Sequence, residues 1–183
     1  MVIGMKNMSN EVLKTMLTRT SVKKYKSDEV QCELIEKIIE AGLYAPSGRN
    51  WQAPIILAVT NKEVRDKLSK LNAKIMGMSE EFDPFYNAPV VLVVLADKSK
   101  NTYVYDGSLV MENMMLAATS LGVGSCWIHR AKETFELPEG KEILKSLGIE
   151  GEYEGIGNCI LGYPDGEIPP VKPRKENRVY YIK

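Results

Sequence analysis

Apolar side chains recur at helical spacing in two amphipathic stretches of the chain. Residues 27–46 repeat them every three or four positions, with Ser27 or Asp28 as the expected cap and Pro46 as the stop. Residues 61–76 follow the same rule and begin with an asparagine, a common capping residue. Both stretches are predicted to be helices with one buried face.

Residues 106–122 show a different pattern, because they are apolar on nearly every side except at Glu112 and Asn113. A helix of this kind is buried all round, in a large core or in a subunit interface. In so short a chain, two copies packing together explain it most simply.

Short apolar runs bounded by Pro, Gly and Asn predict four strands. Because helices separate them, they indicate an α/β or α+β layered architecture around a small sheet. The runs are Ile55–Thr60, Val90–Ala96, Ser125–His129 and Gly157–Tyr163. Residues 164–183 combine prolines and charges with a final apolar "VYYI", so this tail needs another surface to become ordered.

Composition narrows the class of protein. The 183 residues carry 24 basic and 24 acidic side chains, which argues against a protein that binds nucleic acid through a broad basic face. No apolar run approaches the length of a membrane span, and residues 1–183 are expected to form a single domain. Three scattered cysteines suit a reducing cytoplasm, and with a single histidine no metal site is expected.

Three stretches could carry chemistry. "RTSVKKYK" (residues 19–26) has four cations, and "VKPRK" (residues 171–175) has three more, so the two could meet on one phosphate. There are plainer interpretations: the first group of cations simply follows the end of a helix over residues 10–17, and the second lies in a solvated loop. "APSGRNWQAP" (residues 45–54) offers hydrogen-bonding side chains, and "LGVGSCWIH" (residues 121–129) has glycines that permit a tight turn and close approach of a flat ligand.

These motifs, followed by "LGYPDGEIPPVKPRK" (residues 161–175), occur in the order in which the FMN-dependent nitroreductase family has them. The chain resembles that family from about Leu17 to its C-terminus. The resemblance implies an α+β fold with a small mixed β-sheet flanked by helices. It also implies an intertwined homodimer with a long buried interface helix, FMN between the subunits, and a C-terminal tail (about 164–183) wrapped around the partner.

The resemblance also implies roles for individual residues. Lys23 is the candidate for stabilising charge at the flavin N1–O2 edge, and no side chain is expected to act as a nucleophile. Backbone groups near residues 128–130 are expected close to flavin N5, and the loop at residues 46–52 is expected to reach the flavin of the partner. The cofactor-binding residues implied are Arg19, Thr20, Ser21, Lys23, Pro46, Ser47, Asn50, Gln52, Ile128, His129, Arg130, Lys172 and Arg174.

The implied activity is transfer of electrons from NAD(P)H through FMN to an acceptor such as a nitroaromatic or a quinone. Two alternatives stay open: a non-catalytic flavin-binding or flavin-sensing module, and a same-fold flavin enzyme that breaks down flavin or dehalogenates its substrate reductively. The chain departs from some relatives, which have Arg at positions 20 and 23 or Glu-Gly at 129–130. The segment at residues 72–87, where relatives differ most, receives no assigned role.

Overall fold

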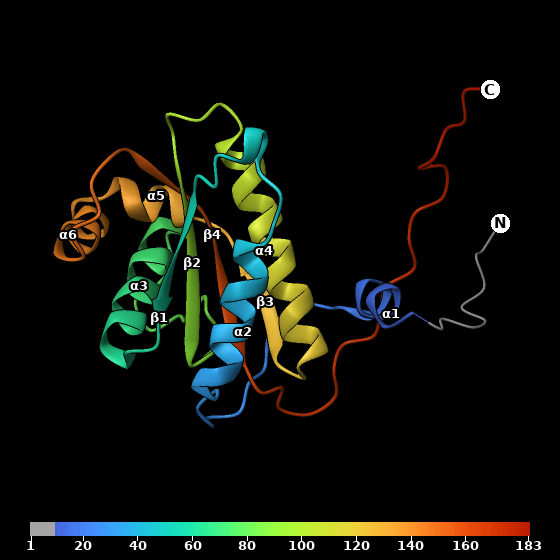
Figure 1. The fold of residues 1–183 in the computed structure, drawn as a ribbon. Coiled ribbons are helices and arrows are strands. Elements are labelled where there is room, and N and C mark those ends of the chain that lie inside the picture. Colours follow the sequence, from blue (N-terminus) through green and yellow to red (C-terminus); the bar gives the residue numbers. More distant parts are fainter. Residues whose placement is uncertain (1–9) are drawn as a thin grey trace.

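The computed structural model describes residues 10–183, arranged as a four-stranded sheet between two layers of helices (Figure 1). The strands are β1 (Pro54–Val59), β2 (Val90–Asp97), β3 (Gly124–Ile128) and β4 (Tyr153–Gly162). The α-helices are α1 (Glu11–Thr18), α2 (Cys32–Leu43), α3 (Lys62–Ile75), α4 (Tyr103–Ser120), α5 (Ala131–Glu136) and α6 (Pro138–Ser146), and a short 3₁₀ turn, η1, spans Gly48–Asn50.

All four predicted strands are confirmed, and they form one sheet in the order β1-β2-β4-β3. Each neighbouring pair is antiparallel, so within the described residues the sheet is not the mixed one that we expected. The connections through α3 and through α5 and α6 reverse the chain between β1 and β2 and between β3 and β4. The connection through α4 does not, because β2 and β3 both run antiparallel to β4, which lies between them. β2 lies in the middle, and Val91–Ala96 are fully buried because helices cover both faces of the sheet.

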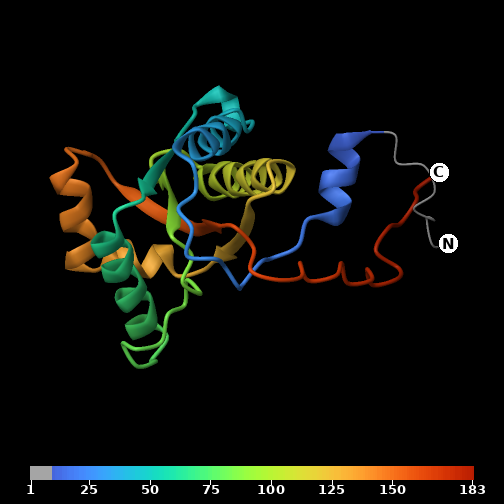
Figure 2. The same ribbon diagram turned by 90° about the horizontal axis from the view of Figure 1, so that it is seen from below.

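Two apolar clusters fill the space on either side of the sheet. On one face α2 and α4 pack over β2, and Leu92 shares a cluster with Met111 and Met114 of α4. On the other face α3, α5 and α6 cover the sheet, and Val91 and Val93 share a cluster with Phe135 of α5. Figure 2 shows the sheet between these two layers. The α+β layered class is therefore confirmed.

The predicted helices exist, but two of them start elsewhere than predicted, and α4 begins at Tyr103 instead of Asp106. α2 starts at Cys32 rather than near Ser27 or Asp28, because the preceding chain is held extended along the sheet. There the Lys26 N–H donates to the Tyr163 carbonyl at 2.9 Å, and Tyr25 forms a bridge with Pro164. The two short helices α5 and α6 were not predicted.

α4 is buried only on the side that faces the sheet and α2. Val110, Met111 and Met114 are at most 4% exposed, whereas Leu109 is 44% and Tyr105 72% exposed in this single chain. Burial all round therefore stays a prediction about a second copy.

α1 and the C-terminal tail both leave the main body on the same side (Figures 1 and 2). α1 has no buried residue, and every residue from 166 to 183 is exposed. Within residues 10–183, no helix combines the length and apolar character that crossing a bilayer requires.

Candidate flavin-binding site

A cavity of about 370 Å³ lies at the carboxyl end of β3. It is bounded by three stretches that are far apart in the sequence: the segment after α1, the segment between α3 and β2, and the end of β3. The lining residues are Ser21, Lys23, Met76, Phe82, Pro84, Tyr86, Cys126, Trp127, Ile128, His129 and Arg130. Five of the thirteen predicted cofactor-binding residues are among them.

The segment at residues 19–23 is fixed to the edge of the sheet by its middle residue. The Val22 N–H donates to the Ser125 carbonyl at 3.0 Å, and Val22 is buried. A Cβ added at Gly124 would lie 3.0 Å from Val22 Cβ, so this glycine makes room for the segment at residues 19–23. We had expected it to make room for a flat ligand. Ser21 and Lys23 flank Val22 and line the cavity.

Two buried asparagines hold the turn at residues 128–130. Asn158 Nδ2 donates to the carbonyls of Ile128 and His129, each at 3.3 Å, and Asn72 Nδ2 donates to the His129 carbonyl at 2.9 Å. Both asparagines are at most 2% exposed. Because buried polar groups need partners, these bonds fix the course of the backbone after β3.

Sequence reasoning missed these two asparagines. Asn158 interrupts the apolar run "IGNCILG", and a polar residue in a buried strand was a visible signal. Asn72 gave no such signal, because it lies in an amphipathic helix where polar residues are common.

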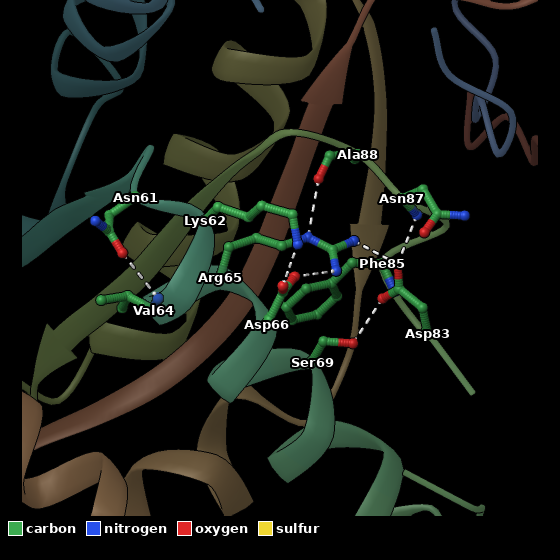
Figure 3. Close-up of polar contacts among 10 residues, drawn as sticks. All are labelled: Asn61, Lys62, Val64, Arg65, Asp66, Ser69, Asp83, Phe85, Asn87 and Ala88. Atoms are coloured by element: carbon green, nitrogen blue, oxygen red, sulfur yellow. Dashed lines mark hydrogen bonds and ion pairs between the residues drawn. The ribbon is translucent and has the colours of Figure 1, made fainter. Parts of the chain in front are cut away.

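A buried ion-pair cluster fixes the third wall of the cavity (Figure 3). Asp83 accepts hydrogen bonds from Arg65 Nη2 (2.5 Å), Ser69 Oγ (2.6 Å) and the N–H groups of Phe85 and Asn87 (2.9 and 2.6 Å). Arg65, only 7% exposed, also donates from Nε to the Ala88 carbonyl at 3.0 Å. Residues 83–88 are thereby tied to α3.

These contacts also set the pKa of Asp83. Burial by itself raises the pKa of a carboxyl group, but the hydrogen bonds from Arg65, Ser69 and the two backbone N–H groups outweigh burial and hold this pKa below its ordinary value. Asp83 is therefore ionised at neutral pH, as its role as a fourfold acceptor requires.

Tyr86 projects from the anchored segment into the cavity wall. Its backbone is left-handed, with φ 53°, and the Lys23 ammonium lies 5.4 Å from the centre of its ring. A cation at this distance over an aromatic face is attracted by it. Lys23 and Tyr86 thus place a positive charge at a defined point of the cavity.

Three buried polar atoms near α1 and the edge of the sheet have no hydrogen-bond partner within residues 10–183: Arg19 Nη1, Thr20 Oγ1 and Ser125 Oγ. The nearest carboxylate to Arg19 is Glu112, with Nε 3.9 Å from Oε1. Buried donors without partners are costly, so they indicate a ligand or a second chain. A cation and two hydroxyl groups suit a phosphate, and the residues present therefore fit the phosphate end of FMN.

The other predicted site residues lie outside this cavity in the single chain. Pro46, Ser47, Asn50 and Gln52 belong to the loop around η1, which is fixed to α4 by a 3.0 Å bond from the Gly48 N–H to Asp106 Oδ1. Lys172 and Arg174 lie in the exposed tail. The structure thus brings together Ser21, Lys23 and Ile128–Arg130, but not the loop and tail residues.

Comparison with known proteins identifies the class. The model of the nitroreductase family matches residues 16–163. The NAD(P)H FMN reductase of Bacillus subtilis is 35% identical over 182 residues, covering 90% of this chain and 70% of that protein. The chain therefore belongs to the nitroreductase family, and the predicted family is confirmed.

Solved structures agree with this assignment. A nitroreductase with bound FMN from Bacteroides fragilis has a TM-score of 0.85 and 32% identity, covering 95% of this chain and 100% of its own. A second, from Desulfitobacterium hafniense and also with bound FMN, has a TM-score of 0.84 and 29% identity, covering 96% and 100%. The nitroreductase fold is thus confirmed over nearly the whole described chain.

Proposed function

We propose that this protein is an FMN-dependent oxidoreductase that passes electrons from NAD(P)H through bound flavin to an acceptor such as a nitroaromatic or a quinone. The observation that carries the proposal is the cavity in which Ser21 and Lys23 face the turn at residues 128–130. The FMN-bound relatives and the FMN reductase of Bacillus subtilis support the cofactor and the electron donor.

The residues of this chain have distinct tasks in the proposal. Arg19 and Thr20 hold the phosphate, because their buried donors otherwise have no partner in the described chain. Lys23 supplies a fixed positive charge, which favours negative charge on a group bound beside it. The turn at residues 128–130, held by Asn72 and Asn158, offers a rigid backbone edge. FMN itself, when bound, supplies hydride acceptance at N5 and electron release to the second substrate.

A homodimer completes the proposed site. The loop around η1, with Pro46, Ser47, Asn50 and Gln52, would reach the flavin held by a second copy. The tail from about residue 164 would wrap that copy and bring Lys172 and Arg174 to the phosphate. In support, α1 exposes Val12, Leu13, Met16 and Leu17, and the tail exposes Tyr180, Tyr181 and Ile182. Apolar surface of this extent favours association.

Residues 1–183 act as one FMN-binding domain in this proposal. A cytoplasmic location also belongs to it, because the three cysteines are unpaired thiols, as a reducing compartment favours.

An anaerobic spectroscopic titration tests the function. The purified protein, loaded with FMN, is mixed with NADH or NADPH without oxygen, and the visible absorbance of its oxidised flavin is followed. A nitroarene or a quinone is then added. We expect the absorbance to fall with at least one nucleotide and to return with the acceptor. Bound flavin that neither nucleotide reduces would instead identify a non-catalytic flavin-binding module.

A further inference from the structure

Arg130 has a backbone conformation that side-chain-bearing residues rarely adopt. Its φ of 73° and ψ of 15° lie in the left-handed region, where a Cβ is strained. Surrounding contacts hold it there: its carbonyl accepts from both the N–H and the hydroxyl of Thr134, at 3.0 and 2.8 Å. Strain of this kind at the wall of a cavity suggests a function for the side chain.

The side chain of Arg130 is also fixed in direction. Its Nε donates to Asn72 Oδ1 at 3.0 Å, and Asn72 is fully buried. Among residues 10–183 this is the one hydrogen-bond partner of the guanidinium, which forms no ion pair there. The two terminal nitrogens stay available, and an arginine keeps its charge at any ordinary pH.

The rest of the cavity favours a flat anion. Among the described lining residues, Lys23, His129 and Arg130 are basic, and none is Asp or Glu. Phe82, Tyr86 and Trp127 add aromatic surface. Lys23 is already occupied with Tyr86 and, in the proposed function, with the flavin. Arg130 is therefore the cation left for a second ligand.

We infer that the Arg130 guanidinium recognises an anionic oxygen group, a carboxylate or a phosphate, on the substrate that enters this cavity. Arg130 is thus a specificity-determining residue that makes the protein prefer an anionic substrate to a neutral one of the same shape. The inference rests on the proposed function for the identity of the flavin site. The anion can belong to the electron acceptor or to the nicotinamide nucleotide, since both carry oxyanions that a guanidinium binds.

Equilibrium binding tests the inference without turnover. Benzoate and benzamide have nearly the same shape but differ in charge, and neither is reduced. Calorimetric titration of the FMN-loaded protein should show about tenfold tighter binding of benzoate, as a charge-assisted hydrogen bond would give. Arg130→Gly should lower this ratio about fivefold or more, and Arg130→Lys should retain part of it.

Arg130→Gly is well suited to this test, because glycine adopts positive φ without strain and the fold should survive. Arg130→Gln provides a second uncharged variant that keeps a polar side chain. Lys67→Ala is the matched control: it removes one exposed cation from α3, and Lys67 does not line the cavity. The control should keep the wild-type ratio of the two affinities.

Two kinetic pairs identify the source of the anion. For the acceptor, kcat/KM is compared between 4-nitrobenzoate and nitrobenzene; for the donor, between reduced nicotinamide mononucleotide and reduced nicotinamide riboside. The inference is supported where Arg130→Gly removes the preference for the charged member of a pair, and that pair names the source. It is overturned if all charge preferences, benzoate over benzamide included, are the same in wild type and variant.

Failure of the proposed function gives a different result. Flavin that is never reduced by any donor removes the kinetic pairs but leaves the benzoate and benzamide affinities measurable. Those affinities then decide the inference by themselves.

Discussion

Arg19 is the side chain on which retention of the cofactor depends most in this account. Its guanidinium is mostly buried beside Glu112, and its Nη1 has no partner among residues 10–183. A buried donor of this kind is stabilised when an anion arrives. In the proposed site, the hydroxyl groups of the next residues, Thr20 and Ser21, would bind the same anion.

Arg19→Ala should therefore weaken binding of FMN by on the order of 1.5–3 kcal/mol, the contribution of a charge-assisted hydrogen bond. Fluorescence titration of the apoprotein with FMN measures this change. Lys26→Ala is the control, because Lys26 is exposed and does not line the cavity. Equal affinities in wild type and Arg19→Ala would remove the phosphate role.

Lys23 is expected to act on the flavin potential more than on flavin binding. Reduction adds negative charge to a bound flavin, and a fixed cation beside it favours that form. Lys23→Met should lower the two-electron midpoint potential by about 20–30 mV, which corresponds to roughly 1–1.4 kcal/mol. Spectroelectrochemistry measures this shift.

Lys24→Met is the matched control, because Lys24 pairs with Asp165 at 2.8 Å and does not line the cavity. An unaltered potential in Lys23→Met, or an equal shift in both variants, would exclude Lys23 from the chemistry.

At the scale of elements, the segment before β2 owes its position to α3. Asp83 ties residues 83–88 to Arg65 and Ser69, and Tyr86 and Asn87 take left-handed φ values of 53° and 58° within that segment. Strained backbone persists only where surrounding contacts determine it. The cluster in Figure 3 is thus the support of one cavity wall.

Asp83→Asn should lower the free energy of unfolding by on the order of 2–4 kcal/mol, because the buried Arg65 loses its ion pair with Asp83 and keeps only the pair with the more exposed Asp66. The pKa of Asp83 is lower in the folded chain than in the unfolded one, so its contribution is fully present above about pH 4 and is lost as pH falls through the folded pKa. Denaturant unfolding at several pH values should show that the free energy of unfolding of the wild type falls at acid pH, and that this fall is smaller in the variant.

Asp165→Asn serves as the control for this experiment, because its ion pair with Lys24 is exposed and should contribute little. A stability of Asp83→Asn equal to that of wild type at neutral pH would contradict the anchoring role.

Much of the fold was predictable at this scale, since short apolar runs bounded by Pro, Gly and Asn located the four strands and helical spacing located the long helices. The short helices α5 and α6, of six and nine residues, have too few turns to show a clear period. The start of α2 was wrong because long-range pairing of Lys26 with Tyr163 keeps the chain extended. The motifs located Ser21, Lys23 and the turn at residues 128–130, but local spacing could not reveal the asparagines that hold this turn.

At the scale of the whole molecule, the chain has two parts that leave its body. α1 and the tail expose apolar side chains, among them Leu13, Met16, Tyr180 and Ile182, without a partner surface in the described chain. The predicted loop residues around η1 also do not line the cavity. A second copy accounts for all three features, and residues 164–183 are the part of the chain proposed to wrap it.

Removal of residues 166–183 should therefore weaken the dimer and lower the affinity for FMN, because the apolar contacts of the tail and the cations Lys172 and Arg174 are lost. Each affinity should fall by at least about tenfold, the effect of losing one charge-assisted hydrogen bond or more. Light scattering across a dilution series and FMN titration measure the two effects. A truncated chain that stays dimeric and binds FMN as the full chain does would contradict the wrapped tail.

A crystal structure of the FMN-loaded protein tests the central claim most directly. The account predicts the flavin ring beside Lys23 and the turn at residues 128–130, with the phosphate within hydrogen-bonding distance of Arg19. It also predicts that the tail cation Arg174 lies at the same phosphate and that a second copy covers the flavin. FMN bound elsewhere, with Arg19 still paired only with Glu112, would contradict it.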